Sequence, residues 1–223
     1  MAISIEALKP AAALKFWSGK VPVTKKEFNT LCANAKARAF TVTGMAKQDQ
    51  VKAVLQALQK MLDEGGTLAD FKDQISDIIE TQGWKGKKAY RVENIFRTNM
   101  QSAYSAGRYE QLQKSKRLRP YWRYLAVGDR HSRPSHMALN GKIYPADHPF
   151  WDLYYPLNGF GCRCIVQSLS KRQVEAGGYT VESEMPGPTM VKMPDGSEVN
   201  TNPMPDKGWS NNVGKNWLAG LNS

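Results

Sequence analysis

The sequence predicts an α+β protein with a helical N-terminal region (residues 1–116), a small β-containing domain (117–172) and an extended C-terminal tail (173–223). In the first region, apolar residues recur at the three-and-four spacing of amphipathic helices. After Pro120 the chain is rich in aromatic and β-favouring residues, as strands are. Beyond about Glu182 it is rich in Pro, Gly, Asn and Met, which predicts an extended segment.

Four helices are predicted in the N-terminal region. The expected ranges are Thr24–Phe40, Gln48–Asp63, Thr67–Ile79 and Lys87–Ser115. The glycine pair after the second range ends that helix, because glycine adopts positive φ without strain. Thr67 is a plausible N-cap for the third helix, since its hydroxyl can accept a bond from a free backbone N–H. The first three helices are too short to be stable alone, so we expect them to pack together or on a partner.

Three strands are predicted in the second region. They are Tyr121–Val127, Ile143–Tyr144 and Ile165–Leu169, separated by turns that contain proline and glycine. The tail has too few periodic apolar residues to fold alone. We expect it to lie over the core or over a neighbouring protein, anchored by Trp209 and Trp217.

The positive charge of the chain is concentrated in one segment. The formal net charge is +11, and residues 85–123 contain eleven Lys and Arg but only two acidic residues. The fourth helix therefore has a basic face, which is either an ordinary solvated surface or a surface for a polyanion such as DNA. The candidate DNA-binding residues are Lys85, Lys87, Lys88, Arg91, Arg97, Arg108, Lys114 and Arg117.

The sequence argues against a membrane, secreted, disulfide-rich or cofactor-binding protein. No apolar run approaches the roughly 20 residues that cross a bilayer, and the N-terminus lacks a secretory pattern, so we expect a soluble protein made in a cytosol without membrane contact. Three cysteines, two of them separated by one residue, do not form a disulfide framework, so we expect reduced thiols. There is no glycine-rich phosphate loop and no nucleophile elbow, and we expect no cofactor.

The candidate catalytic and metal-binding residues lie between Asp129 and Cys164, a segment that includes all three histidines. Asp129, Arg133 and His136 are spaced so that a turn could bring an acid, a cation and a base together, as general acid/base cleavage of RNA would require. The alternative is structural: Asp129 caps a turn, Arg133 pairs with a carboxylate and His136 bonds a backbone carbonyl. We expect the structural arrangement and no catalytic residues, and keep the nuclease as the alternative.

Cys162 and Cys164 raise the question of a metal. A zinc site could use both thiolates with His136, or draw on His131, His148 or Asp147. In an extended Cys-x-Cys segment, however, the two α-carbons lie nearly 7 Å apart, which is too wide for one ion unless the chain bends. We therefore expect no metal, with both cysteines packed as small apolar residues and Arg163 on the other face, and keep zinc as the alternative.

Several short motifs, in order along the chain, resemble those of one known family. They are Arg97-Thr98-Asn99, Ala103-Tyr104, Gly107-Arg108, Arg119-Pro120-Tyr121, Asp129, Arg133-Pro134-x-His136, Leu139-x-Gly141, His148-Pro149-Phe150-Trp151, Pro156-x-Asn158-Gly159, Cys162-Arg163-Cys164 and Gly208-Trp209-x-Asn211-Asn212-x-Gly214-Lys215. The chain resembles the Mu F-like phage head morphogenesis family in the order and spacing of these motifs. The residues that the resemblance marks as its structural motif are Gly141, Asp147, Trp151, Asn158, Gly159, Cys162, Arg163 and Cys164.

The resemblance implies a minor head protein of a tailed bacteriophage. Such a protein would contact the portal, scaffold or major capsid protein and, through the basic helix, packaged DNA without sequence preference. It would be made in the bacterial host cytoplasm and lie inside the virion head. The same domain is similar to small nuclease-like α+β folds that include RNase toxins, which keeps the enzyme alternative open.

Overall fold

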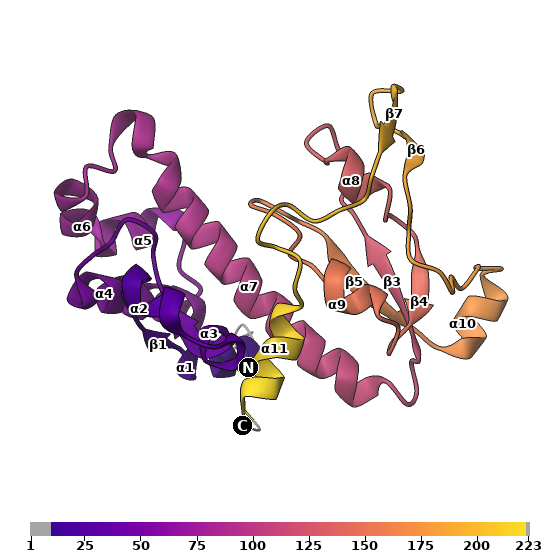
Figure 1. Ribbon diagram of the computed structural model, residues 1–223, viewed down its shortest axis with the longest axis horizontal. Helices are drawn as coiled ribbons and strands as arrows, with labels where there is room; N and C mark the ends of the chain where they lie inside the picture. The colour runs from indigo at the N-terminus through magenta and orange to yellow at the C-terminus, as the bar shows by residue number, and fades with distance from the viewer. Residues whose placement is uncertain (1–9, 222–223) are drawn as a thin grey trace, which may run out of the picture. The chain divides into compact units, whose positions relative to one another are not determined.

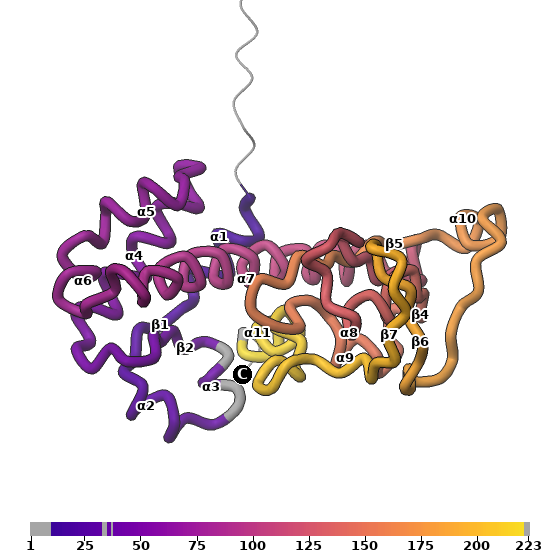
Figure 2. The backbone as a smooth tube through the Cα atoms, turned by 90° about the horizontal axis from the view of Figure 1, so that it is seen from above, coloured from indigo at the N-terminus to yellow at the C-terminus, as the bar shows by residue number. Residues whose placement is uncertain are grey.

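The computed structural model describes residues 10–221, apart from the side chains of residues 33, 34, 37 and 221, and these residues form two compact units (Figure 1). Within the described range, the first unit contains the residues up to Arg108 together with 219–221, and the second is Tyr109–Leu218. One long helix, α7 (Tyr90–Ser115), contributes residues to both units and is continuous along its length (Figure 2). None of the helices in residues 10–221 is long and apolar enough to cross a membrane.

The first unit is mainly helical. Besides part of α7 it contains α1 (Ala11–Ser18), α2 (Lys25–Thr30), α3 (Ala33–Arg38), α4 (Gln48–Glu64), α5 (Leu68–Gln74), α6 (Ser76–Thr81), a 3₁₀ turn η1 (Gly86–Lys88), and two short parallel strands, β1 (Val21–Pro22) and β2 (Ala39–Phe40). Its core is formed largely by the apolar face of α4, where Val51, Val54 and Leu58 are fully buried.

The boundaries between α4 and α5 follow the sequence prediction. Gly65 adopts φ of 74° and ends α4, because its N–H bonds the Met61 carbonyl in a left-handed C-cap. Thr67 then begins α5 with a capping box, in which its hydroxyl accepts from the Asp70 N–H while the Asp70 carboxylate accepts from the Thr67 N–H.

Two predicted helices are each divided in the structure. The range Thr24–Phe40 contains α2, α3 and β2, because Leu31 and Cys32 have extended backbone conformations. Thr30, at the end of α2, donates its hydroxyl to the Glu27 carbonyl at 2.7 Å, which helps to satisfy the helix end. The third predicted helix is interrupted at Ile75, which is buried at the bend between α5 and α6. The prediction of single helices was wrong at these two positions.

The second unit contains a three-stranded antiparallel sheet in the order β4–β3–β5. The strands are β3 (Tyr121–Leu125), β4 (Ile143–Pro145) and β5 (Ile165–Leu169), and the helices near them are α8 (Pro134–Met137), α9 (Phe150–Tyr154) and α10 (Lys171–Ala176). All three predicted strands are present, although the first ends two residues early. The α+β class is therefore confirmed.

The core of this unit is aromatic. Trp122 and Tyr124 alternate with half-buried residues along β3 and are fully buried. Phe150 stacks on Tyr144 with ring centroids 4.0 Å apart and meets Trp151 edge to face at 4.7 Å. This rigid packing positions the loops before α8 and β5, which carry the candidate site residues.

The tail has more structure than the sequence predicted. It contains a hairpin of β6 (Thr189–Lys192) and β7 (Glu198–Thr201) and a last helix, α11 (Val213–Leu221) (Figure 2). The expectation of an entirely extended tail was wrong in this respect. The predicted anchoring residues are packed, however: Trp217 is 1% exposed, and Trp209 lies 5.0 Å from the ring of Phe160.

Neither end of residues 117–172 coincides with a boundary between the two compact units. Those residues belong to the same unit as most of 173–218, and the end of α7 also belongs to it. The division of the chain into residues 1–116, 117–172 and 173–223 therefore stays a prediction.

Candidate functional site

The predicted DNA-binding residues fall into two groups. Three have carboxylate partners: Lys85 lies 2.5 Å from Glu80, Arg97 lies 2.6 Å from Glu93, and Lys114 lies 2.9 Å from Glu110. The guanidinium of Arg91 lies over the Trp84 ring and donates to the Thr43 carbonyl.

The second group consists of Lys87, Lys88, Arg108 and Arg117. All four are exposed, and within residues 10–221 none of them has a hydrogen-bond or ion-pair partner. These four cations are available to a polyanion without first breaking a contact of the protein. All eight residues stay predicted DNA contacts, and these four differ from the others in having no such partner among the described residues.

Asp129 pairs with Arg163 and not with Arg133. Both carboxylate oxygens of Asp129 accept from the Arg163 guanidinium, at 2.6 and 2.7 Å. Asp129 also caps a turn, since it accepts the His131 N–H at 3.0 Å. The Arg163 guanidinium is the main cause that holds the pKa of the Asp129 carboxyl far below its usual range.

Arg133 contacts Phe160 and Asp206 instead of Asp129. Its guanidinium donates to the Phe160 carbonyl at 2.6 Å and lies 3.7 Å from the Asp206 carboxylate. Arg133 and His136 line one small pocket, but Asp129 does not. The structure therefore does not bring Asp129, Arg133 and His136 together as an acid, a cation and a base around one space.

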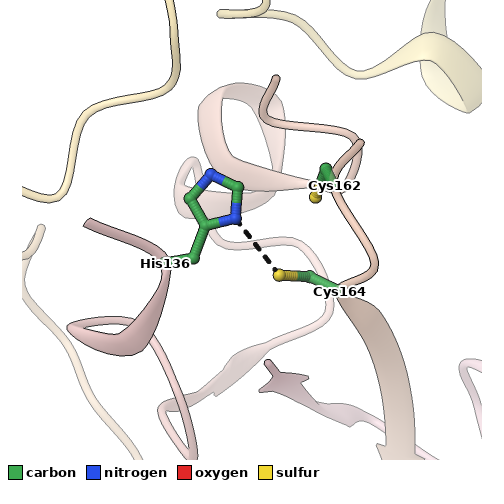
Figure 3. Close-up of side chains that lie close together, drawn as sticks. All are labelled: His136, Cys162 and Cys164. Carbon is green, nitrogen blue, oxygen red and sulfur yellow. Dashed lines mark hydrogen bonds between the residues drawn. The ribbon is translucent and has the colours of Figure 1, made fainter. Parts of the chain in front are cut away.

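His136, Cys162 and Cys164 do come together (Figure 3). One ring nitrogen and the two sulfurs all lie within 4.8 Å of one another, and Nδ1 of His136 is 3.4 Å from the Cys164 sulfur. The three residues are only 4%, 1% and 9% exposed. His136 comes from α8, whereas the cysteines come from the segment that leads into β5.

Two nearby groups affect the pKa values of the thiols. The backbone N–H of Asn158 contributes to the lowered pKa of Cys162, and the Tyr124 hydroxyl opposes the rise in the pKa of Cys164. Asn158 also donates its side-chain amide to the Tyr124 hydroxyl at 3.0 Å. The hydrogen bond between the two cysteines lowers the pKa of the Cys162 thiol and raises that of Cys164, so any thiolate is expected at Cys162.

A small pocket of about 20 Å³ adjoins the cluster. It is lined by Val127, His131, Ser132, Arg133, His136, Gly161, Cys162, Arg163 and Cys164. Nε2 of His136 is buried and has no hydrogen-bond partner among residues 10–221. This pocket is large enough for about one water molecule.

The other two histidines and Asp147 lie outside the cluster. His131 accepts from Arg130 at 3.2 Å, and His148 accepts the Phe150 N–H at 3.1 Å. Asp147 is exposed and lies 2.7 Å from the Lys116 ammonium. Of the several metal ligand sets left open by the sequence, only the one that combines His136 with both cysteines is brought together in the described part of the chain.

The remaining motif residues have structural contacts. Gly141 adopts φ of 82° and donates its N–H to the Tyr124 carbonyl. Trp151 is 2% exposed and donates its indole N–H to the Pro145 carbonyl at 3.0 Å. A side chain at Gly159 would overlap the Asp206 carboxylate.

Sequence reasoning missed three residues that shape this region. Tyr124 and Asp206 were not expected near the cysteines and Arg133, because the contacts join segments distant in the sequence. Asn212 donates to the Trp151 carbonyl, which ties the tail to the core. A sequence signal existed only for Asn212, within the closing motif that contains Trp209 and Gly214.

Comparisons with known proteins agree on one family. Residues 52–167 match the family model described as Phage Mu protein F like protein. The chain is 36% identical to the "Mu-like prophage FluMu F protein" of Haemophilus influenzae over 162 residues, which are 67% of this chain and 39% of that protein. It is 29% identical to the "Putative capsid assembly protein F" of Escherichia phage Mu over 240 residues, with 93% of this chain and 54% of that protein covered.

The chain thus spans about half the length, or less, of these curated relatives. No solved structure matches it significantly. The family model covers most of α4, all of α7, β3 and β4, the start of β5 and the whole cluster of His136, Cys162 and Cys164, with both units represented. On the match to the family model, the chain belongs to the Phage Mu protein F like family.

Proposed function

We propose that this protein acts in capsid assembly of a Mu-like phage or prophage as a minor head protein. The observation that carries the proposal is its membership of the Mu F-like family, together with a relative named as a putative capsid assembly protein whose match covers 93% of this chain. Its partners in this role are the portal, scaffold or major capsid protein, and its place is the interior of the virion head.

The second part of the proposal is a contact with packaged DNA through residues 85–117. Lys87, Lys88, Arg108 and Arg117 support it, because they are exposed and have no partner among residues 10–221. Lysine and arginine bind phosphates without reading the bases, so the contact would be independent of DNA sequence. Lys85, Arg97 and Lys114 would contribute less, since each already has a carboxylate within 3 Å.

The geometry gives little support to an RNase function. The carboxylate of Asp129 is held by Arg163, and His136 is buried beside two cysteines, so neither is arranged for proton transfer to a substrate.

The assembly role is tested by producing the head proteins of the same phage or prophage together, with and without this chain. We expect the chain to co-sediment with heads and to co-purify with the portal, scaffold or major capsid protein. Heads of unchanged number, shape and composition that never contain the chain would overturn the proposal.

The DNA contact is tested by measuring the affinity for a duplex of arbitrary sequence at several salt concentrations. Four phosphate contacts predict a slope of log K against log salt of about −3.6. The variant K87A/K88A/R108A/R117A should bind more weakly and lose most of this slope. Its folding is checked by circular dichroism, because exposed substitutions should change stability by less than about 0.5 kcal/mol.

The matched control is K26A/K52A/K60A/K72A, which removes the same number of charges. These four lysines are exposed and have no partner among residues 10–221, and they lie on other helices, α2, α4 and α5. The control should retain the salt slope of the wild type. Equal weakening in the two variants would show that only net charge matters, and would refute the assignment to residues 85–117.

A further inference from the structure

We propose that His136, Cys162 and Cys164 bind one Zn²⁺ ion, with a water molecule as the fourth ligand. This inference is independent of the role in capsid assembly, because it rests on the geometry of the three side chains in Figure 3. An imidazole and two thiolates are ligands that zinc prefers.

The spacing of the ligand atoms is close to that of a tetrahedral zinc site. Bonds of about 2.3 Å to sulfur and about 2.0 Å to nitrogen place neighbouring ligand atoms about 3.5 to 3.8 Å apart. Nδ1 of His136 is already 3.4 Å from the Cys164 sulfur, and no pair among the three atoms exceeds 4.8 Å. Movements of about 1 Å or less would therefore complete the site, which side-chain rotations can supply.

The backbone explains how a Cys-x-Cys pair can serve one ion. The Cys162 N–H bonds the Gly159 carbonyl, and Gly161 adopts φ of 66°, so the chain turns tightly just before the pair. Cys162 and Cys164 then both face the interior, while Arg163 between them is exposed and pairs with Asp129. The two sulfurs therefore lie close to His136, although only one residue separates the cysteines, where a zinc knuckle usually has two to four.

The chemistry of the donor atoms favours zinc. Within residues 10–221 the metal-binding group contains no carboxylate, which favours a soft N/S site for zinc over one for magnesium or calcium.

The pocket beside the cluster provides the fourth position. All three ligand residues line it, and its volume of about 20 Å³ accommodates one water. When Nδ1 binds the ion, Nε2 of His136 carries the proton; this nitrogen is buried and has no hydrogen-bond partner among the described residues. The ion would link α8 to the segment before β5, two elements distant in the sequence.

The test is metal analysis of the full chain, purified without a histidine tag and under reducing conditions. We expect one zinc per chain in the wild type and at least a tenfold loss in C162S/C164S. The control C32S removes the third cysteine, which is exposed and outside the cluster, and should keep its zinc. H131N is a second control, because His131 lines the pocket without joining the cluster, and it should also keep its zinc.

A measurement on the wild type covers the case in which C162S/C164S does not fold. Replacement of the ion by Co²⁺ should give the sulfur-to-metal charge-transfer bands and intense visible bands of a tetrahedral site with two thiolates. Absence of bound metal in the wild type would overturn the proposal. So would zinc retained by C162S/C164S, a cobalt spectrum without thiolate bands, or an intact mass showing that both thiols are lost to a disulfide in protein kept under reducing conditions.

Discussion

Replacement of Asn212 by Ala should release the last helix from the core. Asn212 is 2% exposed and has two roles. Its amide donates to the Trp151 carbonyl at 2.9 Å, and its side-chain oxygen accepts the Lys215 N–H at 2.9 Å, as an N-cap does for α11.

The cost of N212A can be worked out from these two bonds. Loss of an N-cap costs about 1 kcal/mol. Loss of the bond from the Asn212 amide to the Trp151 carbonyl costs about 1 kcal/mol more. Together they predict a loss of about 2 kcal/mol in the free energy of unfolding. N212S should recover about 1 kcal/mol, because serine can cap the helix but is too short to reach Trp151.

The assay is urea unfolding followed by tryptophan fluorescence and by circular dichroism. N211A is the matched control: the neighbouring asparagine has no side-chain hydrogen bond within residues 10–221, so its loss should cost less than about 0.5 kcal/mol. Limited proteolysis should also cut N212A near α11 sooner than N211A. Equal stability of N212A and N211A would refute the conclusion that Asn212 fastens the tail to the core.

Two further predictions concern the second unit. F150A should lose about 3 to 5 kcal/mol in the free energy of unfolding by urea, because the ring is fully buried against Tyr144. F160A should lose about 1 kcal/mol or less, because Phe160 is 56% exposed, and similar losses in the two variants would contradict the assigned core. Arg163 lowers the pKa of Asp129 in the folded state. Their pair therefore stabilises the protein at pH values above the ordinary carboxyl pKa of about 3.9, and this stabilisation is lost progressively as the pH falls below that value. The urea midpoint of the wild type should therefore fall more steeply than that of D129N between about pH 5 and pH 3, and parallel curves would count against the linkage.

Much of the fold could be predicted because local signals agreed with tertiary packing. The apolar spacing of α4, the glycine after it and the capping threonine of α5 are all local, and each has the predicted role. The divided helices could not be predicted in this way, since Leu31 and Ile75 fit a helical pattern and only the surrounding structure bends the chain there. The β6–β7 hairpin did have a local signal, the turn sequence Pro194-Asp195-Gly196, which the composition of the tail obscured.

The candidate site shows a different limit. The sequence supplied the possible partners of the cysteines but could not choose among three histidines, because that choice depends on how α8 packs near the segment before β5. The same holds for Asp129, whose partner proved to be Arg163, 34 residues away, and not the nearby Arg133. Spacing predicts neighbours along one element, whereas these pairs join different elements.

The contacts of the tail have a consequence for the order in which the protein is made. Trp209 packs against the ring of Phe160, and Asn212 bonds the Trp151 carbonyl, although both tail residues are translated well after the sheet. A ribosome paused, or a protease acting, between Arg172 and Gly208 would leave an aromatic interior without its cover. The core is therefore complete only after the last segment has been translated. With this topology, partly synthesised chains expose apolar surface and are prone to aggregate.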